Sequence, residues 1–207
     1  MKYTLTTKVD RDEFTDRVSS AFDYEFDGTT NSELPDFDPT HDFNVGLIVG
    51  SSGSGKTQLL IRRFGYKPQE ISWETSKAII SHFENPDDAI KKLLGCGLGS
   101  IPTLCKPFHV LSNGEKYRAT IARKLSDNMI LDEFTSEVNR ETAKSLCVCL
   151  RRFINDSGNK NVVISSCHKD IIGWLQPDWV FDCDSGEQFV NEEPRQSFTK
   201  VARIEIF

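Results

Sequence analysis

Several features that define whole classes of protein are missing from this sequence of 207 residues. No apolar run approaches the ~18 residues of a membrane-spanning helix, and residues 1–6 contain nothing that could serve as a secretory signal. None of the six cysteines forms the C-x-x-C pair that is typical of zinc or thioredoxin-like sites. We therefore expect a cytoplasmic protein with reduced, mostly buried thiols and no integral membrane segment.

Lys and Arg are absent from residues 18–55, a stretch that holds seven acids. Because this stretch contributes −7 to a formal net charge of −6, the rest of the chain carries +1. Basic pairs such as Arg62-Arg63 and Arg151-Arg152 are typical of solvated helix faces. Charge alone thus neither indicates nor excludes nucleic acid as a partner.

What the chain does contain is an alternation of strand-like and helix-like segments, which predicts an α/β fold with a mainly parallel sheet. We expect strands at 2–9, 43–49, 71–73, 129–131, 162–166, 179–183 and 201–207, the last pairing with the first. We expect helices at 14–22, 57–64, 75–94 with a break at Pro86, 112–125 and 141–154. Residues 23–42 and 95–107 are expected to be loops, and 184–186 a turn.

A phosphate-binding loop follows the predicted strand at 43–49. Gly50, Ser51, Ser52, Gly53, Ser54, Gly55, Lys56 and Thr57 form the pattern G-x-x-x-x-G-K-T. Such glycines let backbone N–H groups point at phosphate oxygens, the Lys reaches the β- and γ-phosphates, and the Thr hydroxyl ligates Mg²⁺. The strand before the loop and the helix after it are the context that this motif requires, so the sequence predicts a nucleotide site.

Two acids, Asp132 and Glu133, follow the predicted strand at 129–131. Ligands bind at the carboxyl edge of parallel sheets, where these side chains would meet the phosphate loop. Asp132 is expected to hold Mg²⁺ through water, and Glu133 to orient and deprotonate the attacking water.

A further motif, Ser112-Asn113-Gly114-Glu115, opens the predicted helix at 112–125. Ser112 and Glu115 alone have the spacing of a capping box, which any helix can have. However, the run LSNGEKYRATIARKL resembles the signature of the ATP-binding-cassette (ABC) family, usually LSGGQ followed by xxRxxIARxL. Residues 136–139 are similar to the family's D-loop, and His168, after the strand at 162–166, is similar to its switch histidine.

This resemblance implies a P-loop (RecA-like) ATPase that binds ATP and Mg²⁺. It implies that two chains close head-to-tail, so that the signature of one completes the phosphate site of the other. It further implies a single domain 1–207 with four parts. These are an N-terminal segment 1–42, a core of 43–74 and 126–185, a helical signature lobe 75–125, and a C-terminal strand 186–207. Catalytic roles would then fall to Glu133, His168 and Lys56.

Several positions depart from the family pattern. Asn113 and Glu115 stand where Gly and Gln are usual, Phe134 replaces a Pro, and Asn139 replaces the D-loop Asp. The Q-loop residue, a metal ligand, is either Gln69 or Glu74. Tyr24, Phe22 and Phe26 are candidates for stacking on adenine, with a place in the core as the alternative for all three.

Residues 73–110 look like those of ABC-type ATPases that are fused to, or encoded beside, an acetyltransferase-like (GNAT) domain. This resemblance implies a soluble acetyltransferase-like partner and, by analogy, a role in modifying nucleic acid. The alternative is the ATP-binding subunit of a membrane transporter.

Overall fold

The computed structural model describes residues 2–39 and 42–190. The chain divides into two compact units, of which the first ends at Asp38 and the second begins at Pro39. The division of the sequence into one domain with four parts stays a prediction. Within the described ranges, no helix is long and apolar enough to span a membrane. The predicted strand at 201–207 lies outside the described residues.

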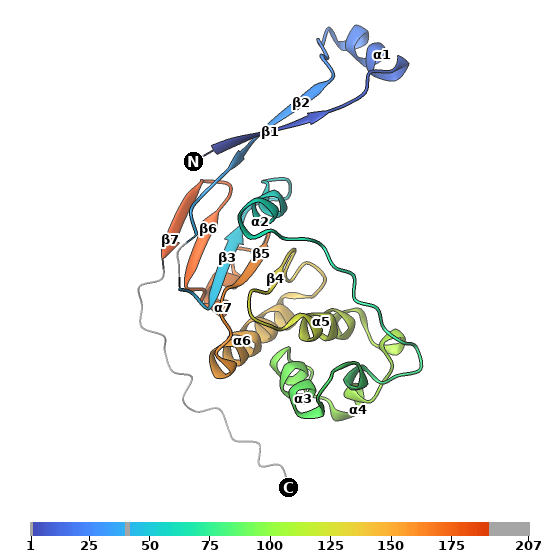
Figure 1. Ribbon diagram of the computed structural model, residues 1–207, viewed down its shortest axis with the longest axis vertical. Coiled ribbons are helices and arrows are strands. Elements are labelled where there is room, and N and C mark those ends of the chain that lie inside the picture. The colour runs from blue at the N-terminus through green and yellow to red at the C-terminus, as the bar shows by residue number, and fades with distance from the viewer. Residues whose placement is uncertain (1, 40–41, 191–207) are drawn as a thin grey trace. The chain divides into compact units, whose positions relative to one another are not determined.

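The first unit is a two-stranded antiparallel sheet that carries a helix between its strands. Strand β1 (Lys2–Lys8) pairs with β2 (Thr29–Pro35) in a register that runs from Lys2 opposite Pro35 to Lys8 opposite Thr29. Helix α1 (Glu13–Phe22) stands between them in the chain and lies at the end of the hairpin where Lys8 pairs with Thr29 (Figure 1). The prediction of a loop throughout 23–42 is therefore wrong, because mostly exposed polar residues form β2 and show no hydrophobic alternation.

The second unit is built on a five-stranded sheet with the order β4-β5-β3-β6-β7. The strands are β3 (Val45–Val49), β4 (Ile130–Leu131), β5 (Val162–Ser166), β6 (Trp179–Asp182) and β7 (Glu187–Val190). All neighbours are parallel except β6 and β7, which pair antiparallel. Every residue of β3 and β5 is buried, as expected for central parallel strands. The predicted α/β fold with a mainly parallel sheet is confirmed.

A glycine makes room for the largest side chain of the sheet. A Cβ on Gly46 in β3 would lie 2.0 Å from the ring of Trp179 in β6. The Trp179 ring stacks on Phe64 at 6.3 Å and meets Phe43 edge-on at 5.3 Å. Phe64 ends helix α2 (Lys56–Phe64), so this cluster fixes that helix against the sheet.

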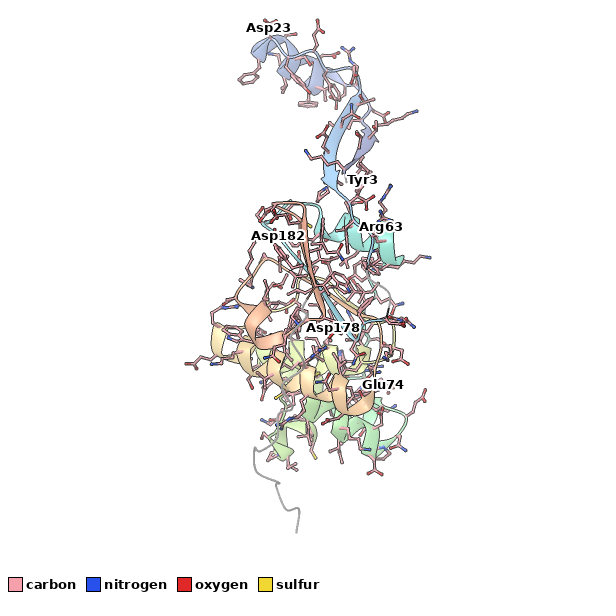
Figure 2. All side chains as sticks on the ribbon, turned by 90° about the vertical axis from the view of Figure 1, so that its left-hand side faces the viewer. Tyr3, Asp23, Arg63, Glu74, Asp178 and Asp182 are labelled. Atoms are coloured by element: carbon pink, nitrogen blue, oxygen red, sulfur yellow. The ribbon has the colours of Figure 1, made fainter. Side chains whose placement is uncertain are left out.

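A buried ion pair holds the start of β3. The carboxylate of Asp178 accepts backbone N–H groups from Asn44 and Val45 and a 2.7 Å hydrogen bond from buried Arg151. Burial by itself would raise the pKa of Asp178, but these hydrogen bonds hold it below its usual value. Figure 2 shows Asp178, which directly precedes β6, and Asp182, the last residue of that strand.

The helical lobe is a series of short helices that share the core of the sheet (Figure 1). Its elements are η1 (Ile79–His82), α3 (Pro86–Gly95), α4 (Ile101–Leu104), η2 (Phe108–Val110) and α5 (Asn113–Lys124). The predicted helix at 75–94 is thus a 3₁₀ turn followed by α3, which begins at Pro86 after the capping side chain of Asn85. The predicted loop at 95–107 contains α4. Helices α6 (Arg140–Ser157) and α7 (Ile171–Leu175) complete the unit.

The predicted strand at 71–73 is wrong, since this segment has no regular structure. Trp73 packs on the helical lobe, where its ring stacks on Phe108 at 4.5 Å. The guanidinium of Arg123 lies 4.8 Å from the same ring and donates to the carbonyl of Ser72. Aromatic packing therefore replaces the sheet pairing that the apolar residues suggested.

Candidate functional site

The phosphate loop connects β3 to α2 with a backbone that depends on glycine. Gly53 and Gly55 have φ of 81° and 91°, in the left-handed region. A Cβ on Gly50 would lie 2.5 Å from Oγ of Ser54. Gly55 is the N-cap of α2, and no side chain caps this helix. Its first backbone N–H groups therefore have no side-chain acceptor, and an anion is favoured at this helix end.

Lys56 folds back over this loop. Its buried ammonium donates to the carbonyls of Gly50 at 2.8 Å and Ser51 at 2.6 Å. Asp184, beyond the end of β6, accepts from the N–H of Ser51 at 3.0 Å and from its hydroxyl at 2.8 Å. These bonds from Ser51, with help from Lys169, lower the pKa of Asp184. The sequence predicted only a turn at Asp184. In the structure its carboxylate binds the phosphate loop after β3 and so connects this loop to the end of the neighbouring strand β6.

The structure brings Thr57 and Asp132 together. The Thr57 hydroxyl donates to Oδ2 of Asp132 at 2.8 Å. The other carboxylate oxygen accepts from the hydroxyl of Ser165 and, at 3.1 Å, from the N–H of Glu133. Paired hydroxyl and carboxylate oxygens are ligands that Mg²⁺ accepts while keeping its waters. Thr57 and Asp132 therefore fit the expected metal position, although no cluster of three metal-ligating side chains occurs among the described residues.

A strained turn follows Asp132. Glu133 and Thr135 have φ of 53° and 70°. This left-handed backbone conformation costs free energy for residues other than glycine. Phe134 between them is fully buried, and its N–H donates to the carbonyl of Ser165 at 2.8 Å. The N–H of Thr135 donates to the hydroxyl of Tyr117 at 2.9 Å. The turn leaves the Glu133 side chain exposed at the carboxyl end of β4.

His168 lies against this turn. Its Nδ1 is 3.2 Å from the hydroxyl of Thr135, and its backbone N–H donates to the hydroxyl of Ser166 at 3.1 Å. Ser166 in turn donates to the carbonyl of Phe134 at 2.8 Å. Sequence reasoning found His168 but missed Thr135 and the two serines that end β5. The sequence feature that could have revealed the serines is the pair of hydroxyl side chains, Ser165 and Ser166, at the carboxyl end of the otherwise apolar β5.

The signature residues form the N-terminus of α5. Ser112 and Glu115 make the capping box: the N–H of Ser112 donates to the Glu115 carboxylate at 2.9 Å, and the N–H of Glu115 donates to the Ser112 hydroxyl at 3.4 Å. The Ser112 hydroxyl also donates to the same carboxylate at 2.8 Å. The backbone and hydroxyl of Ser112, followed by Thr103, lower the pKa of Glu115. Asn113 and Ser112 are exposed. Within the described part of one chain, no hydrogen bond joins the segment from Ser112 to Glu115 to the phosphate loop.

Neither Q-loop candidate contacts Thr57 or Asp132 through a hydrogen bond in the described residues. Gln69 is exposed and lines a cavity of about 600 Å³ beside the start of β4. Glu74, which is labelled in Figure 2, forms an ion pair with Lys77 at 2.7 Å. The Q-loop assignment stays a prediction. Burial, followed by the charges of Asp132 and Glu133, raises the pKa of Tyr66, a residue that the sequence did not single out.

The aromatic candidates for adenine belong to the first unit. Phe22 and Tyr24 are exposed by 77% and 56%, so the alternative that they are core residues is wrong for both. Phe26 is half-buried. Stacking on adenine by any of the three remains a prediction.

No family model matches the chain, and no curated protein matches it. Among solved structures, the ATP-binding cassette MJ0796, as a dimer in a post-hydrolysis state bound to ADP and Pi, matches with a TM-score of 0.52. The match covers 70% of this chain and 84% of that chain at 16% identity. The chain has the fold of an ATP-binding cassette. A second structure, described as dimeric MJ0796, a bacterial ABC transporter cassette, matches at a TM-score of 0.47 and 18% identity, over 67% and 80% of the two chains.

The cassette fold places the carboxyl ends of β3, β4 and β5 at one edge of the sheet. The phosphate loop, the acids after β4 and His168 after β5 all emerge there. At 16% identity the likeness concerns the fold alone. The roles of single residues rest on the contacts described above.

Proposed function

We propose that this chain binds ATP and hydrolyses it to ADP and phosphate. The observation that carries the proposal is the 2.8 Å hydrogen bond from Thr57 to Asp132, which joins a phosphate loop to an acid in a cassette fold. Glu133 follows Asp132 directly, and its side chain is exposed. A general base needs this exposure because it must reach a water molecule.

The open N-terminus of α2 receives the phosphates, and Lys56 exchanges the carbonyls of Gly50 and Ser51 for phosphate oxygens. Thr57 and Asp132 would hold Mg²⁺, which neutralises phosphate charge when bound. Glu133 orients the attacking water and accepts its proton as the water oxygen bonds to the γ-phosphorus. The bond from the γ-phosphorus to the β,γ-bridging oxygen breaks at the same time, and that oxygen leaves with ADP. His168 contacts the γ-phosphate through Nε2 while Thr135 holds Nδ1.

The signature acts in a second copy of the chain. Ser112 and Asn113 are exposed at a helix N-terminus and have no hydrogen bond to the phosphate loop of their own chain within the described residues. The MJ0796 cassette, whose fold this chain shares, is a dimer in its state bound to ADP and Pi, and this supports a homodimer with nucleotide between the subunits. Ser112, Asn113, Gly114 and Glu115 would then meet the partner's nucleotide.

We further propose that the ATP cycle drives or regulates a soluble acetyltransferase-like partner that modifies nucleic acid. The resemblance of residues 73–110 supports this assignment. The competing function is the ATP-binding subunit of a membrane transporter. Co-purification from native cells separates the two: an acetyltransferase-like protein supports the proposal, whereas a multi-span permease overturns this choice of partner and leaves the ATPase untouched.

The ATPase itself is tested by Glu133→Gln. Loss of the general base should slow hydrolysis at least ~10²-fold while ATP still binds. Trapped ATP should hold a dimer that light scattering detects. Glu141→Gln, at an exposed position in the first turn of α6, is the matched control and should keep the parent rate. A Glu133→Gln protein with the parent rate, or one that remains monomeric in ATP, would contradict the assignment.

A further inference from the structure

Helix α1 carries an apolar face that its own unit leaves uncovered. Phe14, Val18 and Phe22 fall at i, i+4 and i+8, which places them on one side of the helix. They are exposed by 80%, 53% and 77%, and α1 contains no buried residue. We call these three residues the α1 apolar face. Figure 2 shows Asp23, at the end of α1, and Tyr3 at opposite ends of the first unit.

Both ends of α1 are nevertheless fixed. At its N-terminus Asp12 and Thr15 form a capping box, with a 2.8 Å hydrogen bond from the N–H of Thr15 to the carboxylate. At its C-terminus Asp23 adopts φ 50°, and the N–H of Tyr24 closes the last turn on Ser19. A ten-residue helix in water gains most of its stability from packing. Local caps on a helix whose large apolar side chains are left exposed by its own unit indicate a preformed docking element.

The charge around this face is strongly acidic. Residues 9–28 hold two basic residues, Arg11 and Arg17, and one of these pairs with Asp16 at 2.6 Å. The same stretch holds seven acids, namely Asp10, Asp12, Glu13, Asp16, Asp23, Glu25 and Asp27. The last turn of α1 contains no basic residue. Any surface that covers the helix must therefore be compatible with a negative rim.

This charge distinguishes among the possible occupants. Nucleic acid and anionic lipid would both be repelled, and amphipathic helices that lie on membranes carry basic polar faces. A second α1 would bring a like charge against its own, and two helices only about 15 Å long cannot supply the area of a stable interface. A groove in a different protein, apolar within and basic at its edges, satisfies both the apolar residues and the acids.

We propose that the α1 apolar face docks in an apolar groove edged by Lys and Arg side chains on a different protein. Phe14 and Phe22 are the anchors, one at each end of the helix, with Val18 between them. The acidic residues around α1 pair with the edges of the groove and speed association. The proposal does not rest on the ATPase activity.

The experiment places p-benzoylphenylalanine at Val18 in the full-length chain, expressed in cells of its source, and irradiates them. The matched control carries the same photo-crosslinker at Ser20, which is exposed on the opposite side of α1. We expect one protein to cross-link from position 18 and not from position 20. That protein is identified by mass spectrometry, purified, and shown from its own structure to have an apolar groove with basic edges.

Binding of the purified pair is then measured with two variants. Phe14→Gln/Phe22→Gln should weaken binding about 30-fold or more, because anchors of this kind dominate an interface. Ile101→Gln/Val110→Gln changes two apolar residues that are exposed by 64% and 54% in the second unit, and should have no effect. Asp10→Lys/Glu25→Lys leaves α1 itself unchanged; it should weaken binding at low salt, and the difference should vanish at high salt.

Four results would each overturn the proposal. They are cross-links of equal yield from positions 18 and 20, cross-links formed only within the chain or to a second copy, a groove with acidic edges, and a Kd that Phe14→Gln/Phe22→Gln leaves unchanged. Loss of ATPase activity in Glu133→Gln would have no bearing on any of them.

Discussion

At the scale of single residues, Thr135 connects the strained turn to His168. Its hydroxyl lies 3.2 Å from Nδ1 of His168 and 3.5 Å from the hydroxyl of Ser166, whose own proton is donated to the carbonyl of Phe134. The shorter contact is the one to the imidazole. A hydroxyl that donates to Nδ1 leaves the proton of a neutral imidazole on Nε2, which is the nitrogen available to a phosphate oxygen.

Replacing Thr135 by Val should lower kcat roughly tenfold with little change in KM, because the shape is kept while the imidazole loses the group that orients it. Thr135→Ser keeps the hydroxyl and should restore most of the rate. The ¹⁵N chemical shifts of the His168 ring report which nitrogen carries the proton, and they should change in the Val variant alone. Equal rates for the Val and Ser variants would show that the hydroxyl is not what matters.

Which site residues the sequence could predict follows from how local their pattern is. The phosphate loop, Asp132 and Glu133 stand in short patterns, and the hydrogen bond from Thr57 to Asp132 brings the two patterns together as expected. Tyr117, Thr135 and Asp184 act through contacts between segments distant in the chain, such as the hydroxyl of Tyr117 at the N–H of Thr135. No spacing rule in a single sequence reveals a contact of that kind.

At the scale of elements, β3 is held by packing that its own sequence only partly reveals. Its apolar run correctly predicted a buried strand, but the reason for Gly46 lies in β6, where Trp179 fills the space above it. The Trp179 ring also stacks on Phe64 at the end of α2. The position of the phosphate loop between β3 and α2 therefore depends on one ring.

Gly46→Ala should lower the free energy of unfolding by about 3 kcal/mol, because a methyl group 2.0 Å from the Trp179 ring forces the sheet to shift. Urea denaturation measures the change. Gly173→Ala in α7 is the matched control: its Cβ would meet nothing within 4 Å, so stability should stay equal or rise. An unfolding midpoint for Gly46→Ala equal to that of the parent chain would show that the ring is not fixed as described.

Elements were predicted where apolar periodicity dominates and missed where it does not. Strands β3 and β5 are fully buried and were expected at nearly the right residues. Strand β2 consists of mainly exposed polar residues, so its sequence resembles a loop. At 71–73 a strand was predicted that does not exist, because the apolar side chain of Trp73 packs on Phe108 and not within a sheet.

At the scale of the whole molecule, the two units differ in charge. Ten acidic and four basic residues stand before Pro39, so the first unit carries the entire formal charge of −6 and the remainder is balanced. Two copies of the second unit can therefore approach each other without net repulsion. This matters for a site that is proposed to form only between two chains, with the phosphate loop from one and Ser112 from the other.

Mixing two inactive variants, Lys56→Ala and Ser112→Arg, should therefore restore ATPase activity. In the mixed dimer one composite site lacks both groups, while the other combines an intact Lys56 with an intact Ser112. The recovered rate should approach that of one working site for each heterodimer.

Fluorescence transfer between labelled subunits shows that they exchange, and thermal unfolding of Ser112→Arg checks that loss of the capping box leaves the fold intact. If Lys56 and Ser112 instead bound the same nucleotide within one chain, every chain in the mixture would remain inactive. An inactive mixture with proven subunit exchange would thus rule out the head-to-tail arrangement.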